Sequence, residues 1–428
     1  MTRRQKRKVI ITVLAVFLSI FTLERIYNSS DEFHVSAMDA SYYGILEAHL
    51  TTKEKFEDFD YLYNLLKENF PFFEVNKRQN GIDWLGNRRK YERIIRNTKN
   101  DAEYLVALDK ILDDLNDGHT NVFGGHGFRE FYKLYYQHSS YFPYWDDVFF
   151  NQYVLNRYMI DDMESIKDME LYDESVLKTK ILLEDKVAYM RIKSMATDND
   201  IVEEDYDKIK KFLKEIEDYD KLIIDIRGNG GGWDIYWQNI VELLINEPLT
   251  VKYYVFYKGG HRYKYDPYRV KYVNTVDELD EEVLKQFPEE VRIDFKYYRI
   301  YSYRINPWDT SLDPSEDIDF KGKIYLLVDR DVFSSAENFA SFCKDTGFAT
   351  LVGEPTGGGK GFDWIPITYL PISKLAVMYS REMVMNADGT INMETKTIPH
   401  IIVDDPTYQE DFNKDQCIQA AIKDNENL

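Results

Sequence analysis

KIYLLVDRDVFSSAENFASFCKDTG, residues 323–347, decides the fold class of this chain. Its apolar run Lys323–Val328 predicts a buried strand, and the segment that begins at Ser334 predicts a helix with two adjacent serines at its start. The earlier stretch KLIIDIRGNGGGW, residues 221–233, predicts another buried strand, which runs into a glycine-rich loop. Strands that alternate with helices in this way predict an α/β fold with a mostly parallel sheet.

Three parts of the chain differ in their residue patterns. Residues 1–30 combine a basic cluster with an apolar run, residues 31–176 predict a helical N-terminal subdomain, and residues 177–428 carry the alternating strands and helices. Within this third part, a polar and aromatic insertion spans about residues 253–319 and shows no clear periodicity. The sequence therefore predicts a targeting segment, a helical subdomain and an α/β core.

The N-terminus is basic and is followed by the uncharged apolar run Val9–Leu23. A basic segment before a short apolar stretch is typical of a secretory signal. We expect an uncleaved signal-anchor that makes the chain a single-pass membrane protein with its body outside the cytoplasm, because positive residues stay on the cytoplasmic side. A cleaved signal peptide, which would release the same body as a secreted protein, is the alternative.

Charge and cysteine usage exclude several classes of protein. The formal net charge of −21 argues against a nucleic-acid partner, whose phosphates require a basic surface. Cys343 and Cys417 are too few for a disulfide framework. The motifs CxxC and HExxH are absent, and the seven histidines are scattered. We therefore expect neither a metal ion nor an organic cofactor, and the oligomeric state stays open.

The segment RGNGGG, Arg227–Gly232, is a candidate for binding an anion. Glycine-rich backbone after a buried strand leaves amide N–H groups open to an oxyanion. Trp233 and Asp234 follow directly, so the segment does not match a dinucleotide-binding loop, and the Gly-Lys-Ser/Thr of a P-loop is also absent. A tight turn without a binding role is the alternative.

The paired serines, Ser334 and Ser335, allow two interpretations. A serine in the first turn of a helix lies where the helix dipole favours a developing alkoxide, and the next N–H can bind an oxyanion. The alternative is an ordinary N-cap serine, with Glu337 in the first turn. A nucleophilic serine needs a base that titrates near neutrality, as imidazole does. Our candidate is His119, which follows the glycine of an expected helix end.

Four motifs, DGHT, LIIDIRGNGGG, SSAE and LVGEPTGGG, occur in this order between about residues 101 and 405. Together they resemble the C-terminal processing and tricorn-core serine peptidases. The resemblance implies a ClpP/crotonase-like α/β core that hydrolyses polypeptide substrates. It also implies that Ser334, three residues before the glutamate of SSAE, is the nucleophile. Ser335 with Gly230 or Gly231 would then form the oxyanion hole.

This family uses two catalytic arrangements, and the sequence carries elements of both. DGHT resembles the tricorn-like members, which implies His119 as the base, oriented by Glu394 or, as the alternative, by Asp117. Lys360 in GGGKGF resembles the lysine of the Ser–Lys members and is the alternative base, although it stands one residue later than their spacing. No PDZ-like segment is evident, so selection of substrate C-termini is not implied.

Two rival functions stay open beside a serine peptidase. The same scaffold could bind peptides without cleaving them, because a fold does not fix a function. The same catalytic groups would also serve a hydrolase of non-peptide esters or amides. The presence of Ser334, His119 and the glycine loop together favours the serine peptidase.

Overall fold

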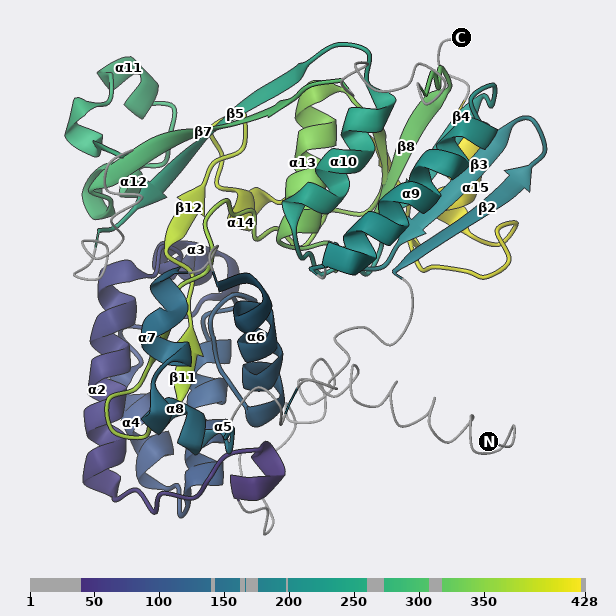
Figure 1. Cartoon of the computed structure of the whole chain (residues 1–428). Helices are drawn as coiled ribbons and strands as arrows, with labels where there is room; N and C mark the ends of the chain where they lie inside the picture. Colours follow the sequence, from purple (N-terminus) through teal and green to yellow (C-terminus); the bar gives the residue numbers. More distant parts are fainter. Residues whose placement is uncertain are drawn as a thin grey trace, which may run out of the picture. The chain divides into compact units, whose positions relative to one another are not determined.

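The computed structural model describes residues 40–139, 143–161, 166, 176–197, 199–259, 273–307 and 318–424 (Figure 1). Ala40–Leu428 form one compact unit. The predicted signal-anchor, residues 1–30, lies outside the described residues. Of the helices that are described, none combines the length and the apolar character needed to cross a membrane.

A six-stranded sheet forms the centre of the α/β core. In spatial order its strands are β13 (Ile401–Ile402), β9 (Thr350–Gly353), β8 (Lys323–Val328), β4 (Lys221–Asp225), β3 (Val187–Ile192) and β2 (Leu177–Leu183). Neighbouring strands run parallel, except that β2 pairs antiparallel with β3. The prediction of an α/β fold with a mostly parallel sheet is confirmed.

Both faces of this sheet are covered, which explains the continuous apolar runs of the central strands. Alternate side chains of a strand point to opposite faces. Leu222 and Ile224 of β4 enter the core formed with the helices α9 (Asn199–Glu215), α10 (Asp234–Leu244) and α13 (Ser335–Thr346). Ile223 of the same strand enters the core formed with α15 (Gln416–Lys423) on the other face. Figure 1 shows the first three helices on one side of the sheet.

The predicted insertion contributes a second, antiparallel sheet. Its strands in spatial order are β12 (Glu382–Val384), β5 (Leu249–Tyr257), β7 (Tyr297–Ile305) and β6 (Asn274–Thr275). Short helices lie between β6 and β7, namely η7 (Val276–Glu278), α11 (Glu281–Leu284) and α12 (Glu289–Asp294). Residues 260–272 and 308–317 of the insertion lie outside the described part of the chain.

The N-terminal part is helical, as the sequence predicts. Its elements are η1 (Ala40–Tyr43), α2 (Thr52–Asn69), α3 (Phe73–Asn80), α4 (Arg88–Arg96), α5 (Asp101–Asp113), α6 (Gly125–His138), η3 (Pro143–Trp145), α7 (Asp146–Phe149) and α8 (Gln152–Arg157). We call this part the helical region. Its core is rich in aromatic side chains, and Trp84, Tyr91 and Tyr104 are almost fully buried there.

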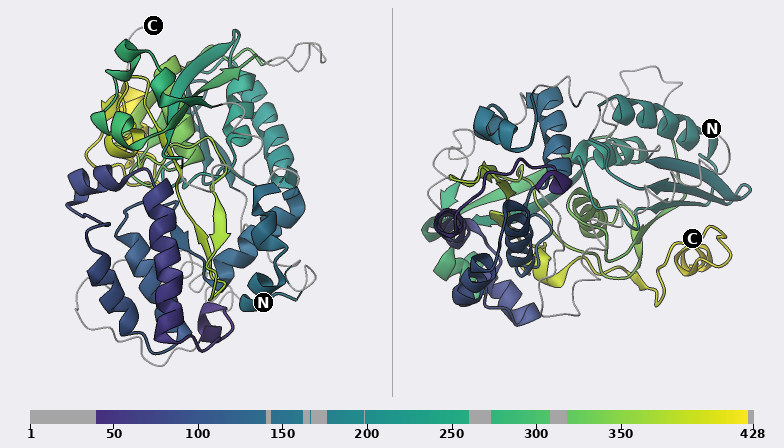
Figure 2. Two further views of the ribbon diagram at one scale, coloured as in Figure 1. Left: turned by 90° about the vertical axis from the view of Figure 1, so that its left-hand side faces the viewer. Right: turned by 90° about the horizontal axis from the view of Figure 1, so that it is seen from below.

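A late segment of the chain completes the helical region. The strands β10 (Ile367–Tyr369) and β11 (Ala376–Met378) pair antiparallel, and β11 pairs in turn with β1 (Asn121–Val122). Figure 2 shows this yellow-green segment among the purple and blue helices. Because β1 directly follows the DGHT segment, this pairing connects DGHT to a segment that begins at Gly357–Gly361, which we call the second glycine loop, the first being Arg227–Gly232. The connection brings the two distant halves of the predicted site together.

Candidate active site

Ser334 occupies the N-cap position of α13, but it does not act as a cap. Its side chain makes no hydrogen bond to the first turn of the helix. Its backbone angles are φ 57° and ψ −122°, a region that residues other than glycine rarely adopt. Such backbone strain is found preferentially at functional sites, where the surrounding structure holds it in place. These observations exclude the ordinary N-cap interpretation for Ser334.

Hydrogen bonds around Ser334 hold this conformation. The N–H of Ser334 donates to the carbonyl of Gly358 (3.3 Å), and its own carbonyl accepts from the N–H of Asn338 (2.9 Å). Glu337, the expected partner in a capping box, is fully buried and instead accepts hydrogen bonds from Asn392 and Thr397, both at 2.6 Å. The glutamate of SSAE therefore anchors α13 to the C-terminal part of the core.

The first glycine loop packs directly against Ser334. A Cβ on Gly231 would lie 2.8 Å from the Cβ of Ser334 and 2.9 Å from the backbone nitrogen of Ser335. Gly231 also has a φ of +107°, so both the lack of space and the backbone conformation exclude a side chain at this position. The buried Arg227 fixes the start of the loop through ion pairs to Asp225 (2.6 Å) and Asp415 (2.8 Å).

The backbone N–H groups that line the cavity near Ser334 differ in part from those expected. The N–H of Gly231 is already donated to Oδ1 of Asn229 at 2.9 Å, and Gly230 is exposed and does not line the cavity. Ser335 and Gly232 line the same cavity as Ser334. Among the hydrogen bonds of the described residues, none uses the N–H of Ser335 or of Gly232. Beside Ser334, the cavity is thus lined by Ser335 and by Gly232, which was not singled out from the sequence, and not by Gly230 or Gly231.

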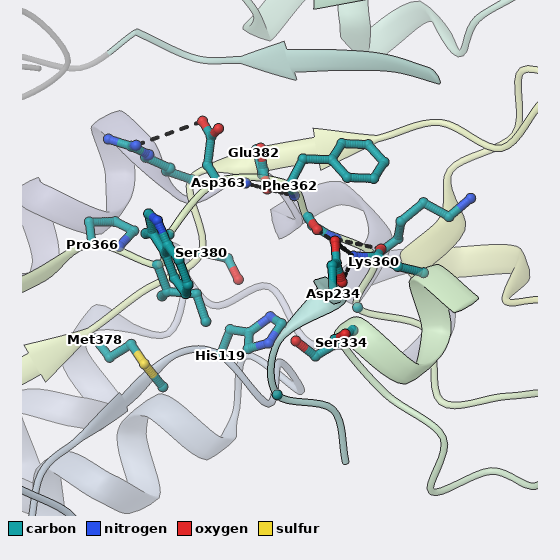
Figure 3. Close-up of a pocket in the computed structure, with 18 of the residues that line it drawn as sticks. His119, Asp234, Ser334, Lys360, Phe362, Asp363, Pro366, Met378, Ser380 and Glu382 are labelled. Atoms are coloured by element: carbon teal, nitrogen blue, oxygen red, sulfur yellow. Dashed lines mark hydrogen bonds and ion pairs between the residues drawn. The ribbon is translucent and has the colours of Figure 1, made fainter. Parts of the chain in front are cut away.

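His119 lies beside Ser334. Its ring packs on the ring of Phe333, the residue before Ser334, with centroids 4.6 Å apart. A Cβ on Gly118 would stand 3.0 Å from the same ring, so the DGHT segment approaches Phe333 closely. Figure 3 shows the imidazole and Ser334 next to each other, and both line the cavity. Burial lowers the pKa of His119, which favours the neutral imidazole that a base requires.

One expectation about the DGHT segment was wrong. Gly118 is not the stop of the preceding helix, because α5 already ends at Asp113 and Asn116 takes the left-handed conformation, with φ 52°. The close approach to Phe333, and not a helix cap, is what requires glycine at position 118.

Asp117, and not Glu394, is the carboxylate near His119. The negative charge of Asp117 acts to raise the pKa of the imidazole, and its side chain lines the cavity. Asp117 accepts hydrogen bonds from the N–H of His119 (3.3 Å) and from the hydroxyl of Thr120 (2.5 Å). Glu394 forms a two-fold hydrogen bond with the guanidinium of Arg78 (2.9 and 2.6 Å) and is not part of the cavity lining. The expectation that Glu394 orients His119 is therefore not met.

Lys360 is buried, but its amine is turned away from Ser334 (Figure 3). The ammonium donates to the hydroxyl of Ser341 and to Oδ1 of Asn386 (3.3 Å), and it lies 4.0 Å from the ring centre of Tyr253. Burial lowers the pKa of Lys360 to about 8. This pKa would suit a base for Ser334, but the side chain points away from Ser334.

A cavity of about 640 Å³ connects these groups. Asp117 and His119 reach it from the DGHT segment, while the first and second glycine loops supply Gly232 and Gly359. Three further carboxylates in its lining, those of Asp234, Asp363 and Glu382, were not singled out from the sequence. Asp234 accepts hydrogen bonds from Tyr303, Trp237 and Asn338, and Glu382 accepts from the N–H groups of Phe362 (2.6 Å) and Asp363 (3.0 Å).

Burial raises the pKa of Asp234 and that of Glu382, the latter to about 7. Asp234 directly follows the glycine loop, which was a usable signal in the sequence. No comparable signal marks Glu382, because its surroundings come from the paired strands β5 and β12.

The profile of peptidase family S41 matches residues 186–403 of this chain. Among solved structures, a protein from Parabacteroides merdae described as a candidate peptidase is similar at 20% identity and a TM-score of 0.54, over 86% of this chain and 95% of that one. Mature CPAF is similar at 13% identity and a TM-score of 0.52, over 82% and 92%. CPAF in complex with lactacystin gives 14% identity and a TM-score of 0.53, over 82% and 94%. None of the curated proteins matches this sequence.

Proposed function

This chain belongs to peptidase family S41, and we propose that it hydrolyses peptide bonds with Ser334 as the nucleophile and His119 as the base. The observation that carries the proposal is the backbone of Ser334. A strained serine that caps nothing, at a helix start and beside an imidazole in one cavity, is the arrangement that a nucleophile requires.

In the proposed reaction, Nε2 or Nδ1 of the neutral His119 accepts the proton of the Ser334 hydroxyl while Oγ attacks the peptide carbonyl. The N–H groups of Ser335 and Gly232 bind the oxyanion of the tetrahedral intermediate. His119 then gives its proton to the leaving amine, and water hydrolyses the acyl-enzyme by the reverse sequence of proton transfers. Each oxyanion donor is expected to contribute about 3 kcal/mol of transition-state stabilisation.

The Ser–Lys arrangement is the second candidate because burial gives Lys360 a suitable pKa. Its amine would have to leave Ser341 and Asn386 and turn toward Ser334, which would break the hydrogen bonds of a buried cation. Leaving buried polar groups unpaired is costly. His119 needs no such rearrangement and is therefore preferred.

A fluorophosphonate probe separates an active serine hydrolase from a protein that only binds peptides. We expect stoichiometric labelling of Ser334 in the wild type, and no labelling in Ser334→Ala or His119→Ala. His126→Ala is a matched control, because His126 is exposed on α6 and outside the cavity lining. Digestion of a peptide library, compared with turnover of small esters, then distinguishes a peptidase from an esterase. Binding of peptides without labelling or cleavage would contradict the proposal.

We further propose that the body of the protein is exported and held at the membrane by Val9–Leu23. The support is the order of basic and apolar residues in the sequence. Fractionation of cells that produce the full chain is expected to place it in the membrane fraction. External protease should digest the body in intact cells. Recovery of the body in the cytosol would contradict export, and recovery in the medium would favour a cleaved signal.

A further inference from the structure

We propose that the apolar part of the cavity is a subsite for a bulky apolar side chain of the substrate, at the residue whose carbonyl Ser334 attacks. We call its lining residues Phe131, Leu134, Trp145, Trp233 and Trp364 the aromatic wall. The inference rests on the proposed function, because it takes the cavity around Ser334 to hold a peptide.

The aromatic wall is a preformed surface. The ring centroid of Trp145 lies 5.8 Å from that of Phe131 and 6.5 Å from that of Trp364. The ring centroid of Trp233 lies 6.4 Å from that of Trp364. The indole N–H of Trp145 donates to the carbonyl of Ile365 at 3.0 Å, which fixes its ring. Edge-to-face contacts of this kind stabilise a fixed arrangement of rings. A substrate side chain therefore meets a surface that needs little reorganisation.

The wall and both proposed catalytic residues line the same cavity. Trp233 is two residues from Gly231, whose Cβ position touches Ser334. On the side of His119, the N–H of Ser380 donates to the hydroxyl of Thr120, the next residue after His119, at 3.0 Å. Met378, two residues before Ser380, also lines the cavity. In Figure 3, His119 lies between Ser334 and Met378. In the bound substrate, the residue that carries the attacked carbonyl has its side chain closest to Ser334. This side chain can therefore reach the wall.

Charged groups at the border of the wall are already matched with one another. The guanidinium of Arg299 lies 2.5 Å from the carboxylate of Asp363, and that of Arg381 lies 3.7 Å from the same carboxylate. Glu382, the neighbour of Arg381, accepts two backbone hydrogen bonds and one from Tyr257 (3.3 Å). A charged substrate side chain would have to compete with these pairs, whereas an apolar one gains contact with the wall.

Three of the five wall residues come from the helical region. Phe131 and Leu134 belong to α6 and Trp145 to η3, whereas Trp233 and Trp364 belong to loops of the core. The helical region would thus supply substrate selectivity as well as His119. This assignment gives the helical region a role in binding the substrate, beyond the role of supplying the base.

The test uses one peptide series in which only the residue before the cleaved bond varies among Phe, Leu, Ala, Asp and Lys. We expect kcat/KM for the Phe and Leu peptides to exceed that for Ala by about 10- to 200-fold, the range that a hydrophobic pocket gives. Mass spectrometry of the products fixes the cleaved bond. Preference for Asp or Lys, or selectivity at another position only, would overturn the inference. Failure to cleave any peptide would contradict the proposed function itself.

Two variants assign the selectivity to the wall. Leu134 is half-buried, and Leu134→Trp should fill the subsite, so that the Phe peptide loses its advantage over Ala. Trp364→Ala, also at a half-buried position, should lower the Phe preference by removing one side of the subsite. Tyr136→Ala is the matched control, because Tyr136 is on α6 but 60% exposed and outside the lining. An unchanged Phe preference in both wall variants would overturn the assignment.

Discussion

A Cβ on Gly231 would stand 2.8 Å from the Cβ of Ser334, which is closer than two such carbons approach in folded proteins. The glycine loop and Ser334 are therefore packed as one unit, and in the proposed reaction the loop can present its backbone to the attacked carbonyl only because position 231 has no side chain. Loop and serine come from positions about 100 residues apart in the sequence, and β4 and β8, which precede them, are neighbours in the sheet.

Replacing Gly231 should damage catalysis more than stability. In Gly231→Ala, the methyl group pushes Ser334 away from its position, and a shift of about 1 Å at a reacting group can cost on the order of 10²-fold in rate. The left-handed φ adds strain of about 1–3 kcal/mol. Steady-state kinetics and thermal unfolding measure the two effects. Gly81→Ala is the control for strain alone, because Gly81 has φ +71° and open space around it. Equal kcat in Gly231→Ala and the wild type would refute the packing argument.

Ser334 should show a conflict between stability and activity. Ser334→Gly removes the strain of φ 57° and should raise the free energy of unfolding by about 1–3 kcal/mol while abolishing turnover. Ser334→Ala abolishes turnover too, but it keeps the strain and gains nothing in stability. Chemical denaturation of the wild type, Ser334→Gly and Ser334→Ala measures the three free energies of unfolding. Asp185→Gly, at an exposed turn with φ 55°, should gain stability without loss of activity. A destabilised Ser334→Gly would show that the conformation is not strained.

The pH profile should report His119. Burial lowers its pKa below the usual value near 6.5, and the base works as the neutral imidazole, so the acid limb of the kcat/KM profile should lie below pH 6.5. Removing the charge in Asp117→Asn takes away the influence that raises this pKa, so the acid limb should move to still lower pH. Measurement of kcat/KM between pH 4 and 8 checks both statements. An acid limb above pH 7 would contradict His119 as the base.

Much of the site could be predicted because its residues stand in short motifs. DGHT, SSAE and the glycine loop are each recognisable from a few adjacent residues, and their order along the chain pointed to Ser334 and His119. Gly232 was missed because the sequence does not show which N–H of a glycine run is already used, and Asn229 takes that of Gly231. The aromatic wall was missed for another reason, since it assembles only when α6, η3 and two loops of the core meet.

The choice between Glu394 and Asp117 depends on a partner that no local pattern reveals. Arg78 of α3 holds Glu394 by two hydrogen bonds, although the two residues are 316 positions apart. We expect Glu394→Gln to leave kcat/KM within about two-fold of the wild type, and to lose at most about 1 kcal/mol of stability, because the pair is partly exposed. Asp117→Asn should lower kcat/KM far more. Steady-state kinetics of both variants checks this, and the opposite order would restore Glu394 as the orienting carboxylate.

Variants of Lys360 best distinguish the two catalytic arrangements. The pKa of Lys360 would suit a base, whereas its side chain is turned away from Ser334. If His119 is the base, Lys360→Met should keep fluorophosphonate labelling of Ser334, since the methionine can occupy the apolar space over Tyr253. The buried amine has a folded-state pKa of about 8, below its unfolded value, so the unfolded chain binds the extra proton between about pH 8 and 10.5. Stability of the wild type should therefore rise with pH in this window, by about 3 kcal/mol from Lys360 alone. The difference between wild type and Lys360→Met in urea unfolding at pH 8 and 10 isolates this contribution. Loss of labelling in Lys360→Met with an unchanged fold would make the lysine, and not His119, the base.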